Sequence, residues 1–212
     1  MWGGGYLLPG RTLHSDFRFG HSGFRAASAY GLGSLLPLVV LFAVVPWFGR
    51  HAIFLGQPFV ILLGFLGLSA LGGGLLTGQL LALSGRSRLA LAIAHGVGFW
   101  PIFGVAATLP ALVGHETIGE LGVRFVPVFS VSYCLISGVG RLLAGHGWKN
   151  AVRSAGIGLV SGTAGAAVLT VVVSVATYET PATVQWFLVV SGTTVACLLS
   201  SGLAGWWGGR SL

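Results

Sequence analysis

The stretch AGIGLVSGTAGAAVLTVVVSVAT, residues 155–177, decides what kind of fold this chain adopts. It contains no charged side chain, and it is long enough to satisfy the roughly 20 apolar residues that an α-helix needs to cross the hydrocarbon core of a bilayer. Its glycines would weaken a helix in water, but they are common in membrane helices, where they let neighbouring backbones approach closely. The stretch therefore predicts a transmembrane helix.

Further runs along the chain have the same apolar character. The predicted spans are residues 30–48, 58–83, 89–113, 125–143, 155–177 and 185–207. Charged residues make up only 7% of the chain, whereas a soluble domain typically carries about a quarter. The fold class that follows is all-α: a polytopic membrane protein built as a bundle of six transmembrane helices. We expect a cytoplasmic N-terminal tail at 1–29, the membrane domain at 30–207 and a short cytoplasmic C-terminus at 208–212.

The basic residues fall mostly on one side of this predicted topology. Nine of the 11 lysines and arginines lie in the tail, in the second and fourth loops with the adjoining span end, or at the C-terminus: Arg11, Arg18, Arg25, Arg86, Arg88, Arg141, Lys149, Arg153 and Arg210. Cytoplasmic loops carry such an excess, so both termini are predicted to be cytoplasmic. The lysines and arginines lie at the ends of the spans and do not form a continuous basic surface. The net charge of +7 therefore indicates membrane topology and not a nucleic-acid partner. The long stem of Arg141 is expected to carry its charge out to the interface.

Two features of the sequence, the N-terminal tail and the regular spacing of three arginines, each leave two interpretations open. Phe17, Phe19 and Phe24 alternate with basic side chains, which fits either a segment lying on the cytoplasmic leaflet or an ordinary flexible tail. Arg25, Arg88 and Arg153 open the odd-numbered spans at intervals of 63 and 65 residues. This spacing fits a triplicated helical hairpin, but any three hairpins of spanning length give a similar period.

The third and fourth spans contain the large side chains with polar groups that lie well inside the apolar runs. His95 stands in the segment HGVGFWP, residues 95–101, and a titratable group inside a membrane is unfavourable enough to suggest function. Trp100 follows it, and Pro101 is expected to break the helix there and bring the two side chains onto one face. With Tyr133 of the fourth span they form the predicted solute-binding site: His95, Trp100 and Tyr133. The competing interpretation is that these groups only bond neighbouring helices together.

Motifs of catalysis or metal binding are missing from the sequence. The segment from His115 to Glu120 begins like a zinc-protease motif, but Gly119 stands where the second histidine is required. Cys134 and Cys197 lie singly inside apolar runs without metal-ligand spacing. We therefore expect no enzyme activity, no catalytic residues, no metal and no cofactor.

Two classes of function remain. The first is a transporter-type protein, or the membrane subunit of a transporter, for a small neutral or weakly polar solute; broken helices with a few polar groups at mid-membrane favour it. The second is a non-catalytic accessory subunit of a larger complex, which the many small-residue helix faces favour. The lipid bilayer is the expected partner in both, and other membrane subunits or further copies of the chain remain open.

Overall fold

The computed structural model of this chain is all-α and describes residues 23–51, 57–112, 118–176 and 182–210. The helices are α1 (Gly23–His51), α2 (Gln57–Leu80), α3 (Gly85–Leu112), α4 (Ile118–Leu143), α5 (Trp148–Ala176) and α6 (Ala182–Arg210). Most of the predicted tail and the pair His115 and Glu116 lie outside the described residues. All six predicted helices are therefore present in the described part of the chain.

Five of these helices are long and apolar enough to cross a membrane by length and composition. The qualifying segments are Gly23–Ala43, Gly85–Val105, Glu120–Leu143, Trp148–Val175 and Phe187–Gly208. An antiparallel series of such helices has no stable arrangement in water, so the chain is an integral multi-pass membrane protein with the lipid bilayer as its partner.

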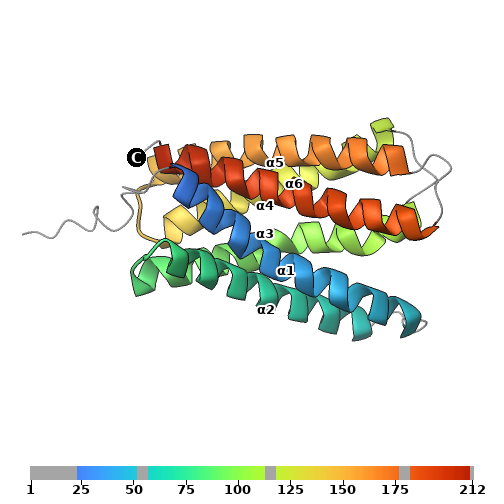
Figure 1. Cartoon of the computed structure of the whole chain (residues 1–212). Helices are drawn as coiled ribbons and strands as arrows, with labels where there is room; N and C mark the ends of the chain where they lie inside the picture. Colours follow the sequence, from blue (N-terminus) through green and yellow to red (C-terminus); the bar gives the residue numbers. More distant parts are fainter. Residues whose placement is uncertain (1–22, 52–56, 113–117, 177–181, 211–212) are drawn as a thin grey trace, which may run out of the picture.

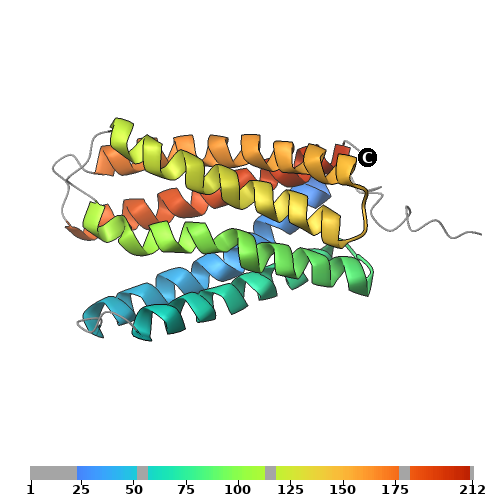
Figure 2. The ribbon, with the colours of Figure 1, turned by 180° about the vertical axis from the view of Figure 1, so that it is seen from behind.

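The helices form a closed ring. Each one packs against the next along the chain, and α6 packs against α1. The start of α1, the end of α6 and the short turns at 81–84 and 144–147 gather at the same end of the bundle, here named the terminal end (Figure 1). Viewed from behind, α3, α4 and α5 close the other side of the ring (Figure 2).

The centre of the ring is filled by side chains. Every helix contributes to one buried apolar cluster, whose largest members come from α3 and α4: Phe99, Phe103, Phe125, Phe129 and Tyr133. Because these aromatic rings pack against one another, the middle of the bundle is a packed core rather than an open channel.

Glycines lie where neighbouring helices cross most closely. A methyl group on Gly158 or Gly162 of α5 would overlap the backbone carbonyls of Tyr133 and Phe129 in α4. Gly205 of α6 stands against the backbone of Ala26 in α1 in the same way. These three glycines therefore seat helix–helix crossings, as is usual for membrane bundles.

The helices begin earlier than the apolar runs predicted. α1 starts at Gly23 instead of residue 30, α4 at Ile118 instead of 125, and α5 at Trp148 instead of 155. An apolar run marks the thickness of the hydrocarbon layer, whereas a helix continues into the headgroup region, where its polar side chains are solvated. Residues 23–29, which we assigned to the tail, are therefore the first two turns of α1.

Candidate functional site

His95 is fully enclosed in the core. Its side chain is 2% exposed, and its ring lies between Tyr30 and Phe99 with centroid distances of 6.0 Å to each. Nδ1 is 2.9 Å from the backbone oxygen of Leu91. A carbonyl only accepts, so Nδ1 donates this hydrogen bond, and in a neutral ring Nε2 keeps a free lone pair as an acceptor.

Tyr133 reaches the same aromatic row from the facing helix. Its ring meets Phe99 edge-on at 6.2 Å, so the predicted pair His95 and Tyr133 both contact the same phenylalanine. The hydroxyl of Tyr133 donates to the backbone oxygen of Cys197 at 2.9 Å. It lies 3.1 Å from the hydroxyl of Ser201, which must be the donor because the phenol proton is already used. Tyr133 thus ties α4 to α6.

Trp100 does not join these two residues. α3 continues through Pro101 as a helix, so the realignment that we expected from a break does not occur. Five residues along an ideal helix turn through about 140°, and Trp100 accordingly faces outward, 46% exposed. It borders an apolar groove of about 520 Å³ between α2 and α3, beside Gly64 and Gly67. The predicted three-residue cluster is therefore divided between the core and the outer surface.

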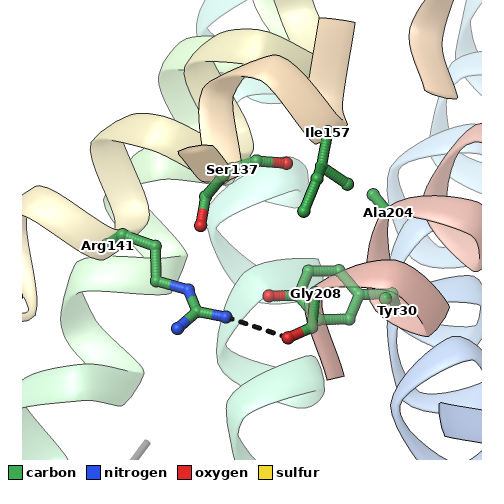
Figure 3. Close-up of a pocket in the computed structure, with 8 residues that line it drawn as sticks. Tyr30, Ser137, Arg141, Ile157, Ala204 and Gly208 are labelled. Atoms are coloured by element: carbon green, nitrogen blue, oxygen red, sulfur yellow. Dashed lines mark hydrogen bonds between the residues drawn. The ribbon is translucent and has the colours of Figure 1, made fainter. Parts of the chain in front are cut away.

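Arg141 is the polar residue whose position the sequence did not reveal. We expected it to extend to the interface, but it is only 5% exposed and turns into the bundle near the terminal end. Its guanidinium donates to the backbone oxygen of Gly208 in α6 at 3.4 Å (Figure 3). The carbonyls at a helix C-terminus carry partial negative charge and favour a cation there. The helical spacing from Ser137 to Arg141 was the available signal, because it places both on one face of α4.

Arg141 lines a small pocket with hydroxyl groups from three helices. Tyr30 of α1, Ser137 of α4 and Ser154 of α5 contribute them around a cavity of about 20 Å³, which is room for roughly one water molecule. Within the described ranges, these three hydroxyls make no hydrogen bond. Several other helical hydroxyls bond to their own backbone, as Ser161 does to Gly158 at 3.0 Å, whereas Ser132 and Ser200 in the core also have no hydrogen-bond partner among the described residues. The pocket therefore combines a cation with unused hydroxyl groups.

The pocket and the core residues are connected. The ring of Tyr30 lines the pocket and stacks on His95, which in turn stacks on Phe99 beside Tyr133. A row of polar and aromatic side chains therefore leads from the terminal end into the centre of the ring. Such a row is suited to hydrogen bonding and stacking. In the described residues no three His, Cys, Asp or Glu side chains gather as a metal site.

Comparisons with protein-family models, with curated proteins and with solved structures find no match to this chain.

Proposed function

We propose that α2 is also a membrane span, so that six helices cross the bilayer with both termini in the cytoplasm. α2 is 24 residues long and contains no charged side chain. It alternates in direction with its neighbours, and it packs between α1 and α3 in the ring. In this orientation the terminal end, with its basic residues, faces the cytoplasm.

The closed ring also favours an origin from three helical hairpins, α1–α2, α3–α4 and α5–α6. Arg25 and Arg88, at equivalent positions of the first two units, both donate to backbone oxygens near the end of α2, those of Leu80 and Leu83. Arg153 opens the third unit at the equivalent position.

We propose that the protein is a transporter-type membrane protein, or the membrane subunit of a transporter, for a small neutral or weakly polar solute. The observation that supports this is the polar row inside the ring, from the pocket at Tyr30 through His95 to Tyr133. Polar side chains inside a membrane bundle commonly mark a solute path. We assign no enzymatic step, metal or cofactor to it.

His95 and Tyr133 have separate roles in this proposal. His95 Nε2 accepts a hydrogen bond from the solute, and the Tyr133 hydroxyl exchanges its bond with Ser201 for one with the solute. Passage requires the aromatic row around Phe99 to open, since the core is packed in this state. Trp100 is left out of the path because it faces the outer groove.

Solute flux across vesicles tests the transport proposal. We expect proteoliposomes to equilibrate glycerol or urea faster than protein-free vesicles, as measured by stopped-flow light scattering. His95→Leu, which keeps the volume and removes the polarity, is expected to lower that rate about tenfold, as the loss of a buried hydrogen bond implies. Trp100→Leu is the matched control outside the path and should leave the rate unchanged. A rate equal to that of empty vesicles for a panel of such solutes, or one unaffected by His95→Leu, contradicts the proposal.

An accessory membrane subunit is the second candidate, and the outer groove favours it. The groove is apolar, and a Cβ on Gly64 would meet nothing within 4 Å, which leaves room for a side chain from a partner helix beside Trp100. Under this proposal a partner copurifies in fixed ratio in mild detergent, and Gly64→Leu releases it by filling the groove. Gly156→Leu, at a similarly open position on α5, is the control. A chain that purifies alone argues against this second function.

A further inference from the structure

We propose that the pocket around Arg141 is an anion site that binds one oxygen of a phosphate group, supplied by an anionic lipid headgroup or by free phosphate. This inference concerns the terminal end of the bundle and stands whether or not a solute passes through the core. It rests on the donors that converge there, the charge around them, and the depth and size of the pocket.

The donors match an oxyanion. The guanidinium of Arg141 is a planar fork that suits phosphate oxygens, and it is held in place by its bond to Gly208 at 3.4 Å. Tyr30, Ser137 and Ser154 bring three hydroxyls from three different helices to the same cavity. Each hydroxyl can donate to an anion, and within the described part of the chain none is used elsewhere. Figure 3 shows Arg141, Ser137 and Tyr30 around this space.

The surroundings of the pocket are basic. The lysines and arginines of the terminal end whose side chains are described, besides Arg141, are Arg25, Arg86, Arg88, Lys149 and Arg153. Positive charge near a membrane surface attracts anionic headgroups, and salt screens the contribution of each exposed residue. The local potential therefore raises the concentration of anions at the mouth of the pocket.

The pocket lies close to the ends of the helices that line it, where a headgroup at the membrane surface can reach it. Arg141 lies about 3 Å and Tyr30 about 10 Å from the ends of their helices at 1.5 Å per residue. The cavity of about 20 Å³ admits a single water-sized group, which is the size of one phosphate oxygen. The rest of the phosphate then stays at the mouth, within reach of a lipid in the adjacent leaflet.

Two probes distinguish the sources of the phosphate. Native mass spectrometry of the detergent-purified full chain measures the binding of added phosphatidylglycerol. Thermal unfolding with inorganic phosphate, compared with chloride at equal ionic strength, measures the binding of the free anion. Retained phosphatidylglycerol assigns the site to a lipid headgroup, and stabilisation by phosphate alone assigns it to a soluble ligand.

Variants decide whether the pocket is responsible. The double variant Ser137→Ala with Ser154→Ala keeps Arg141 in place, and we expect it to weaken binding about tenfold or more, because hydrogen bonds to charged groups are strong. Arg141→Gln should weaken binding further. Lys149→Gln is the control for general surface charge and should change binding less than about twofold. The proposal is wrong if neither probe binds, or if the double serine variant binds as well as the Lys149 control.

Discussion

The hydroxyl of Tyr133 joins two helices inside the core, and this makes its contribution to stability measurable. Tyr133→Phe removes the bonds to Cys197 and Ser201 while keeping the ring that packs on Phe99. We expect a loss of about 1 kcal/mol in the free energy of unfolding, the usual net value of a buried hydrogen bond. Denaturation in detergent micelles measures it.

Tyr30→Phe is the matched control for that measurement. Its hydroxyl makes no hydrogen bond among the described residues, so in phosphate-free buffer its removal should leave the free energy of unfolding nearly unchanged. Equal losses in the two variants would show that the Tyr133 hydroxyl does not stabilise the fold.

The sequence identified some of the candidate site residues and missed others for a physical reason. His95 and Tyr133 stand out because polar side chains in apolar runs are rare, and burial follows directly from their position. Arg141 stands at the end of a run, where both an outward and an inward side chain are sterically allowed. Its inward direction depends on the space left by Gly208 and Ala204 of α6, which no local pattern encodes.

The close contact between α4 and α5 depends on two glycines of α5, Gly158 and Gly162, which have no side chain. A Cβ on Gly158 would overlap the carbonyl of Tyr133, and backbone atoms cannot move aside as a flexible side chain does. We expect Gly158→Ala to destabilise the protein by about 2–3 kcal/mol, as overpacking usually does, and to lower its melting temperature in detergent.

Gly156→Ala is the control for Gly158→Ala, because Gly156 lies on a different face of α5. A Cβ there meets nothing within 4 Å, so alanine should be neutral or should stabilise by up to about 1 kcal/mol through its higher helix propensity. If both variants unfold at the same temperature, the close approach of α4 and α5 does not limit stability.

Helix existence was predictable from the sequence, and helix length was less so. The apolar runs gave the number of helices because each must be apolar over the thickness of a bilayer. The extra turns at the starts of α1, α4 and α5 were missed because they consist partly of polar residues. In the headgroup region a polar segment can be a helix or a loop, and the apolar pattern does not distinguish the two. The contact between α1 and α6 that closes the ring could not be predicted from local sequence patterns either. It depends on Gly205 packing against Ala26, and these two residues are far apart in the sequence.

Cysteine labelling of intact cells tests the orientation of the molecule. In a background of Cys134→Ala and Cys197→Ala, an impermeant maleimide should label Ile118→Cys, at the start of α4, and should miss Gly85→Cys at the terminal end. Cys197→Ala is tolerable here because the backbone oxygen that accepts from Tyr133 remains. Gly85 is a suitable position since it is exposed and a side chain there meets nothing within 4 Å. The opposite labelling pattern would place both termini outside.

Because α1 and α6 are in contact, the ring fixes the cyclic order of the helices but does not fix which helix comes first in the chain. A circular permutant that joins the end of α6 to the start of α1, and opens the chain in the turn at 81–84 or 144–147, keeps every neighbouring pair of the ring. Each of these cuts lies at the terminal end, so each permuted chain still begins with a helix running in the same direction. The first hairpin to enter the membrane would differ, yet the finished ring would be the same.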